Sequence, residues 1–172
     1  FANAADFASS HELFQGTSSI RFSPNLPMTR GMMVTVLHRL EDMPNQQNQH
    51  MFEDVESGTW YTEAVQWATA IGIIEGDGGN RFAPEKDITR EELVTILYRY
   101  ANTIEIDMSP QNDLSKFPDG ENTSSWAKEA MEWAVGTGLI TGKDGNRLDP
   151  TGIATRAEVA IVLQRLVAII VK

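Results

Sequence analysis

Nine arginines lie at regular intervals along this 172-residue chain, and their spacing points to a binding chemistry. They occupy three columns of equivalent positions, with offsets of 60 and 66 residues between successive members. The columns are Arg21, Arg81 and Arg147; Arg30, Arg90 and Arg156; and Arg39, Arg99 and Arg165. Because a guanidinium holds a carboxylate through two parallel hydrogen bonds, these columns are candidate sites for an anionic group.

The arginine columns belong to a unit that occurs three times. The segments 7–39, 67–99 and 133–165 align without a gap and share glycine, proline and threonine columns. Polar linkers with Pro44 and Pro110 separate the copies, so we expect repeats at 1–44, 45–110 and 111–172. Phe1 aligns with Tyr61, so we expect copy one to be an N-terminally truncated repeat.

The sequence pattern of each copy predicts a helix, a loop and a second helix. Apolar residues at helical spacing predict a first helix over 61–74, with Gly76 as the residue that ends it. The glycine-rich stretch 76–84 predicts a surface loop. Thr89, with a glutamate three residues later, forms a capping box that starts the second helix. Copy one has Met32 in place of that glutamate, which predicts a weaker helix start.

A single pair of helices of about 14 residues each buries too little apolar surface to offset the conformational entropy lost on folding. We therefore expect the copies to pack as one all-α, pseudo-threefold body with a groove between each pair of neighbouring copies.

The arginine columns differ in their expected roles. Arg39, Arg99 and Arg165 lie near the predicted ends of second helices, where a cation complements the helix dipole. Arg30, Arg90 and Arg156 stand at the first helical residue, where the dipole opposes them. Either a salt bridge, for instance with Asp54 or Asp119, or a ligand in a groove explains them. A groove role predicts that Arg90→Ala weakens binding with little loss of stability. The dipole role predicts that Arg99→Ala lowers stability modestly and leaves binding intact.

Two further features left alternatives open. The loop arginines Arg21, Arg81 and Arg147 are either loop tethers or ligand contacts. Trp60 and Trp126 either pack in the core or offer a ring face to a sugar. Arginines beside an aromatic ring would suit a charged sugar, with guanidinium for carboxylate and ring for pyranose.

Composition excludes several function classes. The chain has 24 acidic and 14 basic residues, a net charge of -10 and no cysteine. This charge disfavours nucleic acid and anionic membranes as partners, and no apolar stretch has the roughly 18 residues of a membrane span. The three histidines are scattered, and the loops lack the EF-hand order, so we expect no catalysis, cofactor or structural metal.

The repeat resembles the S-layer homology (SLH) domain, present here as three tandem modules like those of Gram-positive bacterial surface proteins. The resemblance rests on the segments FEDV and WYTEAVQWA, the loop GDGGNRFAP, ITREE at 88–92, and the intact tetrad TRAE at 155–158. The resemblance covers nearly the whole chain.

The resemblance implies an extracellular module that anchors exoproteins to secondary cell-wall polysaccharide, commonly through pyruvylated N-acetylmannosamine. By position, the tetrad arginines Arg30, Arg90 and Arg156 would contact the ligand. Trp60, Trp126, Gly76, Gly78 and Gly142 would line the site, beside the loop arginines Arg21, Arg81 and Arg147. Copy one departs from the pattern at Gly31, Met32 and Ser18, which puts its groove in doubt. We expect a cargo domain N-terminal to Phe1. The alternative is a protein-interaction or self-assembly module on a scaffold that has lost some glycan sites.

Overall fold

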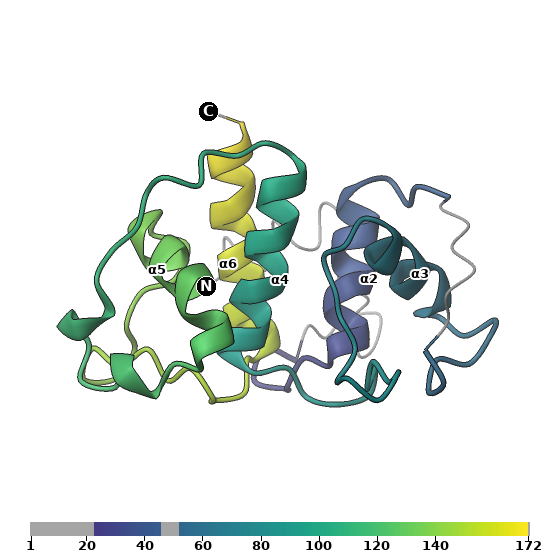
Figure 1. Ribbon diagram of the computed structural model, residues 1–172, viewed down its shortest axis with the longest axis horizontal. Helices are drawn as coiled ribbons and strands as arrows, with labels where there is room; N and C mark the ends of the chain where they lie inside the picture. The colour runs from purple at the N-terminus through teal and green to yellow at the C-terminus, as the bar shows by residue number, and fades with distance from the viewer. Residues whose placement is uncertain (1–22, 46–51, 172) are drawn as a thin grey trace.

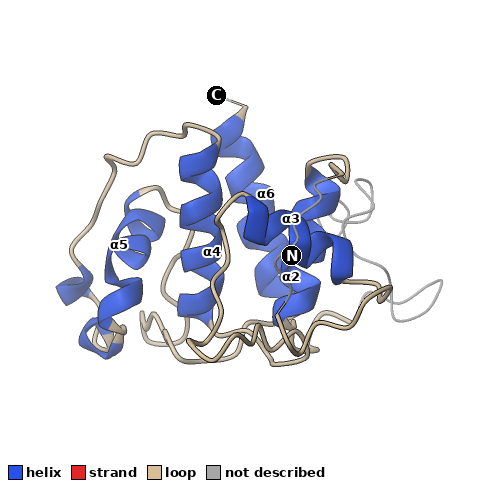
Figure 2. Cartoon of the chain, turned by 45° about the vertical axis from the view of Figure 1, so that its right-hand side comes forward, coloured by secondary structure: helices blue, strands red, loops and turns tan. Residues whose placement is uncertain are grey.

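The computed structural model describes residues 23–45 and 52–171, and within these ranges the chain is helical and forms no strand (Figures 1 and 2). The second helices of the three copies are α2 (Arg30–Leu40), α4 (Arg90–Thr103) and α6 (Arg156–Ile170). The first helices of copies two and three are α3 (Thr62–Ala70) and α5 (Lys128–Gly136). Three single-turn 3₁₀ helices, Leu114–Lys116, Gly120–Asn122 and Ser125–Ala127, precede α5. The predicted all-α class is confirmed, while the first helix expected in copy one lies outside the described residues.

Threonine caps start all three second helices, as the sequence predicts. Thr89 accepts a hydrogen bond from the amide of Glu92, whose carboxylate accepts one from the Thr89 amide at 2.9 Å. Copy three has the same reciprocal pair. In copy one, Thr29 caps the amide of Met32, and methionine has no group to return the bond.

The first helix ends earlier than predicted. In copy two it stops at Ala70, and Gly72 adopts the left-handed conformation with φ of +76°. The amides of Gly72 and Ile73 then bond back to the carbonyls of Thr69 and Ala68, the arrangement of a Schellman motif. The assignment of Gly76 as the helix-ending residue was therefore wrong, because an earlier glycine satisfies the last carbonyls.

A closed ring of backbone hydrogen bonds joins the three copies at the N-terminal ends of the second helices. The amide of Met28 donates to the carbonyl of Ala154, Ala154 to Ile88, and Ile88 to Met28, at 2.8–2.9 Å. The three side chains, one from each copy, are fully buried. Two further sets of backbone hydrogen bonds repeat the cycle. The amides of Arg30, Arg90 and Arg156 donate to the carbonyls of Lys86, Gly152 and Leu26, respectively. Those of Gly31, Glu91 and Ala157 donate to Pro84, Pro150 and Pro24. This cyclic pattern is the expected pseudo-threefold arrangement.

Helix packing crosses the boundaries between the repeats. The first helix of copy two, α3, packs against α2 of copy one, and α5 of copy three packs against α4 of copy two (Figures 1 and 2). One apolar core that includes Leu37, Trp67, Leu97 and Trp133 runs through these pairs. Each copy therefore completes the core of its predecessor, which explains why a single helix pair would not suffice. No helix in the described part of the chain has the length and apolar content of a membrane span.

Candidate functional site

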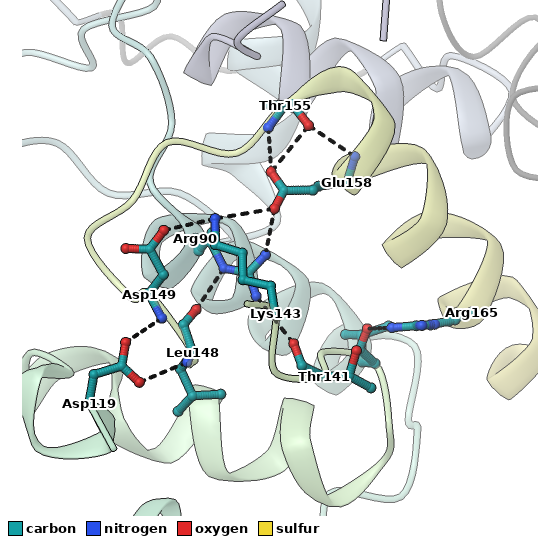
Figure 3. A network of polar contacts seen from close by, with 10 residues as sticks. Arg90, Asp119, Thr141, Lys143, Leu148, Asp149, Thr155, Glu158 and Arg165 are labelled. Atoms are coloured by element: carbon teal, nitrogen blue, oxygen red, sulfur yellow. Dashed lines mark hydrogen bonds and ion pairs between the residues drawn. The ribbon is translucent and has the colours of Figure 1, made fainter. Parts of the chain in front are cut away.

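The tetrad arginines reach from one copy into the next. Arg90 lies on α4, and its Nε donates to the carbonyl of Leu148 in the loop of copy three at 2.7 Å, while Nη1 lies 3.0 Å from Oε1 of Glu158 (Figure 3). Arg30 makes the equivalent contacts with the carbonyl of Phe82 and with Glu92 in copy two. For Arg30 and Arg90 the salt-bridge alternative therefore holds, but the partner is the tetrad glutamate of the following copy and not Asp54 or Asp119, the examples that the sequence suggested.

These ion pairs involve partly buried groups. The side chain of Arg90 is 6% exposed and that of Arg30 is 13% exposed. Burial raises the pKa of Glu158, but the hydrogen bond from the Thr155 amide and the charges of Arg90 and Lys143 outweigh it, so the pKa lies below its ordinary value. The same balance, with Thr89, Lys86 and Arg30, lowers the pKa of Glu92. Both glutamates are therefore ionised at neutral pH.

The entry-segment aspartates hold the glycine-rich loops. Asp119 accepts hydrogen bonds from the amides of Leu148 and Asp149, each at 2.8 Å (Figure 3). Asp54 does the same for the amides of Phe82 and Ala83. Asp149 has a φ of +50°, and the clamp holds this left-handed turn in place. The loop arginines Arg81 and Arg147 are exposed and lie 3.7 and 3.6 Å from Asp54 and Asp119. These contacts correspond to the tether role; Arg21 lies outside the described residues.

A large groove, here called groove A, lies between copies one and two. Its cavity volume is about 540 Å³. The polar groups that line it are Arg30, Glu75, Asp77, Lys86, Glu92, Thr95 and Arg99. Gly76, Phe82 and Trp126 form part of the remaining wall. A volume of this size is typical of small-molecule sites.

A smaller groove, groove B, occupies the equivalent place between copies two and three, with a cavity volume of about 190 Å³. Its polar wall consists of Arg90, Thr141, Lys143, Glu158 and Arg165, and Gly142 lines it as Gly76 lines groove A. The third groove would combine Arg156 with the loop of copy one. Arg156 is buried, but that loop falls outside the described residues, so this groove stays a prediction.

The two candidate tryptophans are exposed rather than part of the core. Trp126 is 57% exposed and lines groove A from copy three, so three copies contribute to that groove. Trp60 is 54% exposed, stands edge-on to Tyr61, and lines neither groove A nor groove B.

The candidate glycines differ from one another. A Cβ on Gly76 would lie 2.8 Å from the ring of Phe52 and 3.0 Å from the carbonyl oxygen of Arg81, so only glycine fits this groove wall. Gly78 adopts a φ of +85° on the exposed loop and does not line either groove.

Sequence reasoning missed the arginines of the third column as groove residues. Arg99 pairs with Glu75 across groove A at 2.9 Å, and Arg165 donates to the carbonyl of Leu139 at 3.1 Å in groove B. The helix-dipole account was wrong for both, because α4 and α6 continue to Thr103 and Ile170 and carry no basic residue in the last turn. The available signal in copy three was the apolar run 166–171, which extends α6 beyond Arg165; Arg39, in the same column, does lie in the last turn of α2.

Comparison with known proteins identifies the repeat. The S-layer homology domain model matches residues 52–94 and 116–160. The chain is 32% identical over 157 residues to exoglucanase XynX of Acetivibrio thermocellus, which covers 91% of this chain and 14% of that protein. It is 30% identical over 158 residues to the surface-layer 125 kDa protein of Lysinibacillus sphaericus, at 90% and 13% coverage.

A third relative carries the word anchoring in its name. The cellulosome-anchoring protein of Acetivibrio thermocellus is 24% identical over 148 residues, covering 84% of this chain and 33% of that protein. The chain thus spans a small part of each of these relatives, and what it shares with the exoglucanase is confined to that part.

Proposed function

Because the chain belongs to the S-layer homology domain family, we propose that it anchors a surface protein non-covalently to anionic, pyruvylated secondary cell-wall polysaccharide. The family, with relatives named as a surface-layer protein and a cellulosome-anchoring protein, assigns the chain to the cell wall or cell surface. A catalytic role does not follow from the relatives named as glycanases, since the match covers only 14% of the exoglucanase.

One observation carries the proposal: equivalent grooves between repeats are lined by arginines in a protein whose net charge is -10. An anionic polymer is repelled by the protein as a whole, so the basic residues of the grooves are the places where it gains charge-assisted hydrogen bonds. In groove A, the exposed ring of Trp126 adds an apolar face suited to a pyranose ring.

The test is isothermal titration calorimetry of the chain with a pyruvylated N-acetylmannosamine glycoside and with its unpyruvylated counterpart. We expect tighter binding of the pyruvylated glycoside, and we expect purified cell-wall polysaccharide to compete with it. An absence of heat with both glycosides and with the polysaccharide would reject the proposal in favour of a protein-interaction module.

A further inference from the structure

The two described grooves differ in the partner of the third-column arginine. In groove A, Nη2 of Arg99 lies 2.9 Å from a carboxylate oxygen of Glu75. Thr141 occupies the position equivalent to Glu75 in groove B, and there Nη1 of Arg165 donates to the carbonyl of Leu139 instead (Figure 3). One column, Glu75 in copy two and Thr141 in copy three, therefore determines whether this guanidinium has a carboxylate partner.

The remaining cations of the two grooves already have carboxylate partners. In groove A, Arg30 and Lys86 both contact Oε1 of Glu92, at 3.1 and 2.9 Å. In groove B, Arg90 and Lys143 contact Oε1 of Glu158, at 3.0 and 3.5 Å.

The second cation comes from a different place in each groove. Lys86 precedes α4, whereas its equivalent in copy three is Gly152, and Lys143 instead occupies the loop position of Asp77. Lys143 also lies 2.8 Å from Asp149. Among the described residues, Arg165 is the groove cation without a carboxylate within 4.0 Å.

The grooves also differ in size and in aromatic lining. Groove B, at about 190 Å³, is below the usual range for a ligand as large as a sugar but has room for a small acidic substituent. Groove A, at about 540 Å³, has room for a sugar ring and includes Trp126. No tryptophan from the described ranges lines groove B.

From these differences we propose that the two grooves recognise different parts of the polymer, and that the residue at position 75 or 141 sets the difference. Groove B binds the carboxylate substituent through the guanidinium of Arg165, which Thr141 leaves without a competing carboxylate. Groove A, in which Arg99 is paired with Glu75, binds an uncharged sugar face against Trp126. This inference rests on the proposed function and adds which chemical group each groove selects.

The test exchanges the two residues. Thr141→Glu places a carboxylate next to Arg165, as Glu75 stands next to Arg99, and Thr141→Gln is the matched control of equal size without the charge. In calorimetry with the pyruvylated glycoside, we expect Thr141→Glu to weaken binding about tenfold or more, because an intramolecular ion pair replaces a charge-assisted bond to the ligand. We expect Thr141→Gln to stay within about threefold of the wild type. Thr141 is exposed, so thermal unfolding of both variants should match the wild type.

Glu75→Thr is the converse variant, and we expect it to release Arg99 and add a second carboxylate-dependent site in groove A. Equal binding by Thr141→Glu and Thr141→Gln, with wild-type affinity for the pyruvylated glycoside, would overturn the inference while leaving the proposed function intact. The inference would also be overturned if Glu75→Thr bound the pyruvylated glycoside with unchanged stoichiometry and affinity. Failure of the wild type to bind the pyruvylated glycoside would instead reject the proposed function, and the inference with it.

Discussion

Arg90 and Glu158 belong to different repeats, yet Nη1 of the arginine lies 3.0 Å from Oε1 of the glutamate, and Nε of Arg90 also donates to the Leu148 carbonyl. Arg30 and Glu92 form the same pair one repeat earlier. The tetrad therefore joins neighbouring copies, and its arginine lines a groove from a position where it also supports the assembly.

This double role changes the expectation for Arg90→Ala. The sequence alone predicted a binding defect with little loss of stability, but the buried guanidinium holds both Glu158 and the loop of copy three. We expect the free energy of unfolding to fall by about 2 kcal/mol, since the substitution leaves the Leu148 carbonyl without its donor and leaves Glu158 with Lys143 as its remaining cation.

Urea-induced unfolding measures this loss, and a double-mutant cycle with Glu158→Ala isolates the pair. A loss below about 1 kcal/mol for Arg90→Ala would contradict the structural role.

The missing capping glutamate in copy one offers a stabilising change. Met32→Glu should complete the box with Thr29, as Glu92 does with Thr89, and should raise the free energy of unfolding by about 0.5–1 kcal/mol. Met32→Leu, which adds no hydrogen-bonding group, should leave stability nearly unchanged. Thermal unfolding of the wild type and the two variants at neutral pH measures the difference in stability. Equal effects of both substitutions would contradict the capping account.

The Asp119 clamp predicts a dependence of stability on pH. Burial raises the pKa of this carboxyl, but the hydrogen bonds from the amides of Asp149 and Leu148 and the charge of Arg147 outweigh it and hold the pKa below its ordinary value. Because the folded-state pKa is lowered, the clamp contributes fully above the ordinary pKa and is lost as the pH falls below about 4.

Asp119→Asn should therefore reduce stability at pH 7 and weaken the acid dependence below pH 4. The check is a series of urea unfolding curves between about pH 7 and pH 3. If the variant and the wild type lost stability in parallel over the acid range, the clamp would not be the cause.

The exposed ring of Trp126 predicts a binding defect without a folding defect. Trp126→Ala removes a side chain that is 57% exposed, so the free energy of unfolding should change by less than about 1 kcal/mol. Binding of cell-wall polysaccharide should weaken, whereas Trp126→Phe, which keeps an aromatic face, should retain most of it. Trp60→Ala is a second control, because Trp60 does not line groove A. Calorimetry with the polysaccharide separates these outcomes, and equal losses for alanine and phenylalanine would exclude a stacking role.

The sequence predicted the local structure well where one residue type has one physical role. Thr89 and Thr155, each with a glutamate three residues later, correctly predicted the starts of α4 and α6. The end of the first helix was misplaced, because Gly72 and Gly76 are both able to end a helix and only the backbone conformation distinguishes them. The partner of Arg90 was missed for another reason: it belongs to a different copy, and periodicity within one copy contains no information about contacts between copies.

The closed backbone ring around Met28, Ile88 and Ala154 fixes the number of copies. With three members, every amide in the cycle meets a carbonyl of the next copy, and no end is left over. A chain with two copies would leave one amide and one carbonyl unmatched in each register, which is the situation of an exposed sheet edge. The complete cycle therefore lets the three-copy chain satisfy its own central backbone groups without a partner from outside the ring.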